Sequence, residues 1–138
     1  MSLKSKFGTV KKAETEGAWV DVLQNEDGTT CRVKIRRAGR RNKDYSRSFE
    51  KHSKPYRRIG LENVDPEIDT KIMRNVIIDS VVTDWENVQL EAGVNIPFSV
   101  ANLENVLIEL PDLQDFIMAK AQEIETFQEQ ALEAEAKN

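Results

Sequence analysis

The stretch "IIDSVVTDWENVQLEAGVNIPFS", residues 77–99, decides how the second half of the chain folds. An apolar run ends at Trp85 between two acids, a polar segment with one glycine follows, and Ile-Pro-Phe-Ser closes the stretch. It contains no His, no Cys and no glycine-rich phosphate loop. We interpret it as a structural corner, in which Trp85 caps a buried helix and Pro97, Phe98 and Ser99 start the next helix at a fixed angle.

Helices are predicted on both sides of this corner. Before it, Pro66 after Asp65 is a typical helix start, and an apolar stripe predicts a buried central helix. After it, Ser99 is a good N-cap, and the Pro111 break separates two further helices. Asn42 is expected to cap an earlier helix that Pro55 ends. The expected helices span residues 42–54, 66–83, 100–110 and 112–128.

The N-terminal half predicts a β-hairpin over residues 17–37. Residues 30–36 alternate between apolar and basic side chains, and the turn is supplied by Asp27-Gly28. A lone hairpin is marginal in water, so it must pack on helices. The expected fold is therefore α+β, an N-terminal antiparallel hairpin or small sheet followed by about four helices. We expect a flexible arm over 1–16, one domain over 17–128 and a polar tail over 129–138.

Composition favours a cytoplasmic protein of one domain. The chain has 138 residues, of which 39% are hydrophobic and 32% charged, and it has a single Cys, which forbids an internal disulfide. No apolar run reaches the ~20 residues that span a bilayer, and the N-terminus lacks the apolar segment of a signal peptide.

Charge is strongly polarised along the chain. Residues 1–60 carry 16 Lys and Arg against 7 Asp and Glu, whereas residues 61–138 carry 4 against 17. The two halves thus have net charges of +9 and −13, which add to the −4 of the whole chain. Such a chain can attract partners of either sign, and its halves can attract one another within a molecule or head to tail between molecules.

Candidate catalytic residues are few. The single histidine, His52, lies among Lys and Arg residues and is interpreted as a solvated side chain on a basic face. Cys31 is interpreted as a small buried residue of the hairpin. No Asp, Glu and His grouping has the spacing of metal ligands. We therefore expect no enzymatic activity, no cofactor and no metal.

Two sets of residues are candidates for contact with a partner. The basic set could meet a protein or the acidic half of the chain, or could follow a nucleic-acid backbone with Tyr45, Phe49 and Tyr56 stacking on bases, which the acidic half disfavours. The second set, on the last helix, could close the core or bind a client. The basic candidates are Arg40, Arg41, Arg47 and Arg58, and the candidates on the last helix are Leu113, Ile117, Ile124 and Phe127.

The order of motifs resembles the tail assembly chaperones of long-tailed bacteriophages. The resemblance covers roughly residues 17–127 and is carried by "CRVKIRRAGRRNKDYSRSFEKHSKPYRR", "VVTDWENV" and "IPFSVANLENVLIELPDLQDFIMAKAQEIETF". It implies non-catalytic binding of the tape measure protein or the major tail (tube) protein in the host cytoplasm. It also implies absence from the mature virion. A structural minor tail or head–tail connector protein, or a single-strand nucleic-acid binder, is the alternative.

Overall fold

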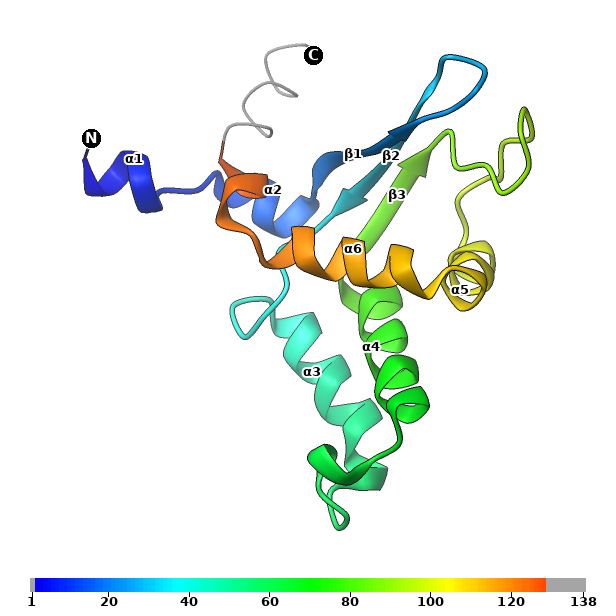
Figure 1. Ribbon diagram of the computed structural model, residues 1–138. Coiled ribbons are helices and arrows are strands. Elements are labelled where there is room, and N and C mark those ends of the chain that lie inside the picture. The colour runs from blue at the N-terminus through cyan, green and yellow to red at the C-terminus, as the bar shows by residue number, and fades with distance from the viewer. Residues whose placement is uncertain (1, 129–138) are drawn as a thin grey trace.

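A three-stranded antiparallel sheet forms one layer of the protein. The computed structural model describes residues 2–128, and its sheet has the order β1-β2-β3, with β1 at Ala18–Gln24, β2 at Thr30–Ile35 and β3 at Val82–Glu86 (Figure 1). The predicted hairpin is therefore present, and β3 joins it from the other half of the chain. With the helices described below, the sheet confirms the predicted α+β class.

The third strand corrects our prediction for the central helix. Helix α4 (Pro66–Ser80) ends before Val81, and Trp85 lies within β3 opposite Val33, so Trp85 does not cap a helix. The register shifts between Lys34 and Ile35, which leaves an extra residue in β3. The two buried side chains of the strand, at 82 and 85, are consequently three residues apart, and the alternation that identifies a strand is lost.

Charges on the outer face of the sheet connect all three strands. Arg32 of β2 lies between Asp21 of β1 and Glu86 of β3, with nitrogen–oxygen distances of 3.1 and 3.6 Å. Its guanidinium carbon also lies 5.2 Å from the ring centre of Trp19. The basic strand is thus flanked by acids on both sides, which favours this strand order over one with β2 at an edge.

The inner face of the sheet is covered by helices α5 (Val100–Glu109) and α6 (Pro111–Gln122) and by the 3-10 helix η3 (Ile124–Phe127). Side chains from these elements and from α4 form one apolar core with the strands. The largest fully buried apolar members are Phe127, Ile35, Ile77, Leu103, Leu107 and Ile117.

Residues 85–99 form a corner between β3 and α5. The indole Nε1–H of Trp85 donates to the Ile96 carbonyl at 2.7 Å, and its ring meets the edge of Phe98 at 5.3 Å between centroids. The Ser99 hydroxyl accepts from the backbone N–H of Asn102, and Pro97 is exposed beside it. The corner is built from the predicted residues, with Trp85 acting from a strand.

The N-terminal segment is more ordered than the flexible arm that we predicted. It contains helices α1 (Leu3–Phe7) and α2 (Lys11–Glu16). Ala13 is buried in the core, and the Val10 N–H donates to the Phe127 carbonyl at 2.8 Å. Residues 9–16 are therefore part of the domain.

The predicted helix over 112–128 is broken in the structure. Helix α6 ends at Gln122, Glu123 is extended, and η3 follows. The break turns the chain so that Phe127 enters the core and its carbonyl meets α2. The predicted tail, 129–138, lies outside the described residues.

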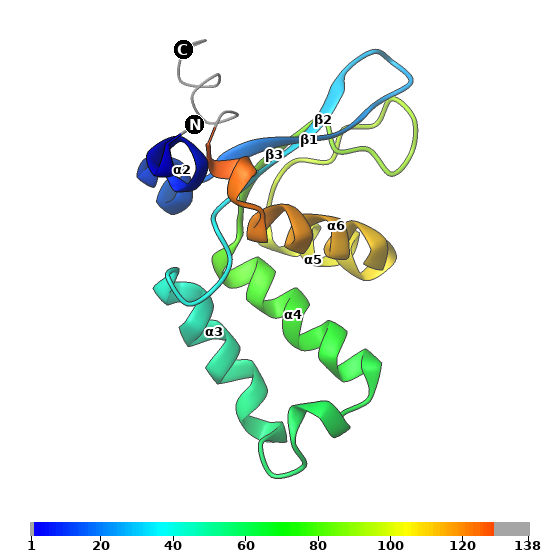
Figure 2. The same ribbon diagram turned by 60° about the vertical axis from the view of Figure 1, so that its left-hand side comes forward.

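A helical hairpin projects from this body (Figures 1 and 2). It consists of α3 (Lys43–Ser53), the 3-10 helices η1 (Lys54–Tyr56) and η2 (Leu61–Asn63), and α4. Asn42 caps α3 as predicted, accepting from the N–H groups of Asp44 and Tyr45, whereas the Asp65 side chain makes no capping bond to α4. None of the helices described in residues 2–128 is long and apolar enough to cross a membrane.

The Trp85 hydrogen bond provides a test of the corner. We expect Trp85→Phe to lower the free energy of unfolding by about 1–3 kcal/mol, because it removes the indole donor and leaves the Ile96 carbonyl without it. Urea unfolding followed by circular dichroism measures the change. The matched control is Trp19→Phe on the outer face, for which we expect a change within about 0.5–1 kcal/mol. Equal losses for the two variants would contradict this account of the corner.

Candidate partner-binding surfaces

The tip of the α3–α4 hairpin exposes apolar side chains next to two arginines. Ile59 and Leu61 are 55% and 36% exposed, and Arg58 beside them is also exposed. Arg57 is held by Glu50 of α3 at 3.2 Å. Between these residues Gly60 has a φ of +84°, a conformation that favours glycine and lets the chain reverse toward α4. The tip is therefore a small apolar surface with cations at its edge.

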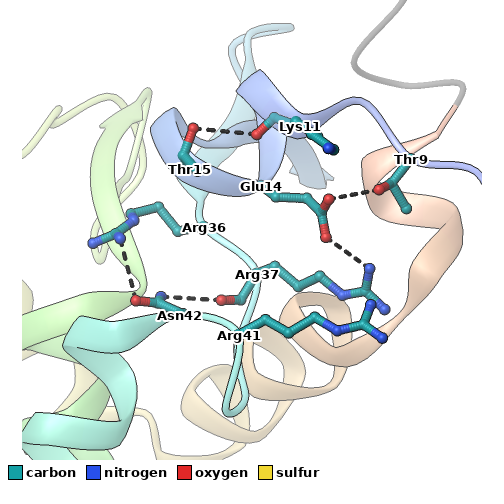
Figure 3. Close-up of a pocket in the computed structure, with 8 residues that line it drawn as sticks. All are labelled: Thr9, Lys11, Glu14, Thr15, Arg36, Arg37, Arg41 and Asn42. Atoms are coloured by element: carbon teal, nitrogen blue, oxygen red, sulfur yellow. Dashed lines mark hydrogen bonds and ion pairs between the residues drawn. The ribbon is translucent and has the colours of Figure 1, made fainter.

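A second candidate surface is a cationic pocket of about 410 Å³, which we name the arginine pocket (Figure 3). It lies between α2 and the loop that joins β2 to α3. The charges of Arg37 and Arg41 both act on Glu14, whereas Arg36 bonds to Asn42, as Figure 3 shows. The lining residues are Thr9, Lys11, Glu14, Thr15, Arg36, Arg37, Arg41 and Asn42.

The backbone of the loop that carries these arginines is fixed by hydrogen bonds. Asn42, which is buried, donates from Nδ2 to the carbonyls of Arg37 and Ser80 at 3.0 and 2.9 Å. The Ala38 N–H donates to the Ala121 carbonyl at 2.9 Å. The backbone on both sides of residues 38–41 is thereby tied to α4 and α6.

Glu14 is the one carboxylate among the lining residues. Its Oε2 accepts from Arg37 at 2.7 Å, and its Oε1 accepts from the Thr9 hydroxyl. Partial burial by itself raises the pKa of Glu14, but the bonds from Thr9 and Arg37 and the charges of Arg37 and Arg41 outweigh it, so the pKa lies below its ordinary value. Glu14 is thus ionised at neutral pH and compensates one of the arginines.

The four predicted basic residues do not form one patch. Arg40 and Arg41 lie in the loop at the base of the hairpin, Arg47 lies on α3 with its side chain 79% exposed, and Arg58 lies near the tip. The aromatics between them are half-buried, and Tyr45 packs against the core. Side chains in such positions are not free to stack on bases, which weakens the nucleic-acid interpretation.

The four candidate residues of the predicted last helix do not form an exposed apolar face. Ile117 and Phe127 are 1% and 0% exposed, Leu113 packs against the core, and Ile124 is half-buried. These residues close the core, because α6 and η3 are the elements that cover the inner face of the sheet. The sequence left two alternatives open for this set, closing the core or binding a client, and the observed burial favours the first.

His52 also differs from its predicted environment. Its Nε2 lies 2.9 Å from Oδ2 of Asp79, and the Ser48 hydroxyl donates to the same oxygen at 2.8 Å. Because serine and histidine both bond to Asp79, the histidine is not placed to take a proton from the serine. The three residues form a polar link between α3 and α4, in place of the solvated histidine that we predicted.

Other reactive groups are buried or scattered. Cys31 is buried as predicted, and burial raises the pKa of its thiol. Within residues 2–128 no group of three or more His, Cys, Asp or Glu side chains is placed to hold a metal. Sequence reasoning missed the Glu14–Arg37 pair, since these residues are far apart in the chain. The apolar tip could have been found, because Ile59 and Leu61 flank a glycine in a polar segment.

The helical hairpin, the corner and the closing helices lie in a region shared with phage proteins. Residues 40–138 match the family model of the YdaY prophage protein. The match covers more than half of the 138 residues, and the chain belongs to this family of phage-derived proteins. The match begins in the loop of the arginine pocket, so β1, β2 and α2 lie outside it. No curated protein and no solved structure matches the chain.

The polar link in the hairpin predicts a pH dependence of stability. Partial burial by itself raises the pKa of Asp79, but the bonds from Ser48 and His52 and the charges of His52 and Lys51 outweigh it and lower the pKa. Its stabilising contribution is therefore complete above the unfolded-state value of about 3.8 and is lost as pH falls through the lower folded value.

We accordingly expect Asp79→Asn to be less stable than the wild type at neutral pH, and the difference to narrow as the solution is acidified below pH 3.8. Urea unfolding at a series of pH values measures it. Asp69→Asn, an exposed position on the same helix, is the control. A difference that stays constant down to strong acid would contradict the ionic role of Asp79.

Proposed function

We propose that this protein is a phage tail assembly chaperone that binds the tape measure protein or the tail tube protein in the host cytoplasm. In this role it catalyses no reaction, and it dissociates from the tail before the virion is complete. Membership of a prophage protein family supports a phage-related role. The finer assignment is supported by the resemblance of the ordered motifs in residues 17–127 to these chaperones.

The observation that carries the binding role is the projecting hairpin. Its tip presents Ile59 and Leu61 to solvent, whereas the apolar side chains that α4 and α6 contribute to the core are buried. Burial of apolar area supplies roughly 25 cal/mol per Å², so two such side chains can anchor a client segment. The exposed cation Arg58 beside them increases the rate of encounter with an acidic client.

A projecting hairpin suits a chaperone for a mechanical reason. The tip is remote from the sheet, so a client can approach it without contacting the rest of the domain (Figures 1 and 2). Helices α3 and α4 pack on each other, with Ser48, Ser53 and Ile72 buried and with a hydrogen bond from Ser48 to Asp79. The tip can therefore be changed without loss of the core, which makes the proposal testable.

We expect Ile59→Asp together with Leu61→Asp to reduce retention of the client by about tenfold or more, because two charges replace the apolar anchor. The protein is co-expressed with the tape measure and tube proteins of its own prophage and recovered by affinity pull-down. Leu23→Asp is the control, because Leu23 is 54% exposed but lies at the end of β1.

Two outcomes would contradict the proposal. If the wild-type protein neither retains nor solubilises the tape measure or tube protein, it is not their chaperone. If mass spectrometry of purified virions finds the protein at a fixed copy number, it is a structural component of the particle. Loss of retention in Leu23→Asp as well as in the tip variant would assign binding to a different surface.

A further inference from the structure

The arginine pocket and an acidic surface lie at opposite ends of α6. We define the acidic corner as Glu109, Asp112 and Asp115, which are exposed where α5 meets α6 and which surround the 41% exposed Leu110. The other end of α6 leads through η3 to α2, whose residues line the arginine pocket. Figure 1 shows α6 running from one of these regions to the other. Helix α6 has twelve residues, and the ten steps from Asp112 to Gln122 span about 15 Å along its axis.

Folding leaves most of the charge asymmetry of the sequence in place. Among the ion pairs of residues 2–128, two join the basic first 60 residues to the acidic remainder, Arg32–Glu86 and His52–Asp79. The other pairs join groups from the same part of the chain. None of the three carboxylates of the acidic corner takes part in an ion pair within the described residues. The arginine pocket and the acidic corner are therefore two separate surfaces of opposite charge on one domain.

The arginine pocket has an excess of positive charge at short range. Arg37 and Arg41 both line the pocket and both charges act on Glu14, which can compensate one of them. Lys11 adds a third cation at the rim. Like charges in one pocket repel, and a carboxylate that enters the pocket relieves the repulsion while forming charge-assisted hydrogen bonds. The hydrogen-bonded backbone of the loop keeps both arginines at the pocket.

We propose that the protein associates head to tail, with the acidic corner of one copy seated in the arginine pocket of the next. Charge complementarity between the two ends favours a second copy as the occupant. The aromatics that could stack on the bases of a nucleic acid are half-buried, so nothing beside the pocket favours that occupant. Leu110 at the centre of the corner adds apolar area to the contact.

This geometry fixes the symmetry of the assembly. Because the two surfaces lie at different ends of one molecule, the contact is heterologous, and it produces a chain or a closed ring instead of a two-fold dimer. Each copy leaves its α3–α4 hairpin projecting from the body. The inference goes beyond the proposed function and does not rest on it, since no client takes part in the contact.

Sedimentation velocity of the full chain tests the proposal. We expect the weight-average sedimentation coefficient to rise with protein concentration at low salt and to fall as NaCl is added, because screening weakens the contact. Arg41→Glu and Asp112→Lys should each weaken association by about tenfold. Circular dichroism shows whether each variant is folded.

An equimolar mixture of Arg41→Glu and Asp112→Lys makes the test specific. In the mixture the intact arginine pocket of one variant meets the intact acidic corner of the other, and the two reversed surfaces also match. We therefore expect the mixture to recover association that each variant lacks alone. Recovery also demonstrates that both variants retain their untouched surface.

Matched controls separate this contact from a general effect of net charge. Arg47→Glu on α3 makes the same charge change as Arg41→Glu. Glu67→Lys on α4 replaces an acid by lysine, as Asp112→Lys does. Neither position lies at the two surfaces. Both should associate as the wild type does. A wild-type protein that stays monomeric at low salt, equal losses in the controls, or a mixture that fails to associate would each overturn the proposal.

Discussion

The position of β2 between two other strands is the constraint on which the rest of the structure depends. Its inner side chains, Val33 and Ile35, need cover from the core, and its outer Arg32 needs acids on either side. In the β1–β2 hairpin, β1 supplies a neighbour along one edge of β2 only. The second edge is filled by β3, which arrives from beyond α4 and ties the two halves of the chain together. Helices α5 and α6, which cover the sheet, follow β3 through the corner at residues 87–99.

The departure of β3 from the sheet determines where the remaining elements go. Trp85 reaches from the strand to the backbone at Ile96, and its contact with Phe98 sets the point at which α5 begins. Helices α5 and α6 then cross the inner face, and η3 returns the chain to α2. One buried indole therefore links the sheet, the corner and the closing helices, and the α3–α4 hairpin is left to project because α5 and α6 occupy the sheet.

The same arrangement keeps the charges of the chain separated. Most ion pairs form between residues of the same half of the chain, and the arginine pocket and the acidic corner remain as surfaces of opposite charge. The proposed client site and the proposed self-association site use different parts of this surface. The first is the apolar tip of the hairpin, and the second joins the ends of α6. An assembly of this kind would present several hairpins to one long client.

The sequence by itself determined the α+β class, the hairpin, the N-caps at Asn42 and Ser99 and the residues of the corner, because these features depend on local periodicity and capping chemistry. Tertiary structure alone decided what depends on distant contacts. The bulge in β3 hid the strand, and the requirement to bury Phe127 broke the last helix and removed the predicted client face. Likewise Glu14 meets Arg37, and Asp79 meets His52, only after folding, since neither spacing in the chain indicates that the side chains approach.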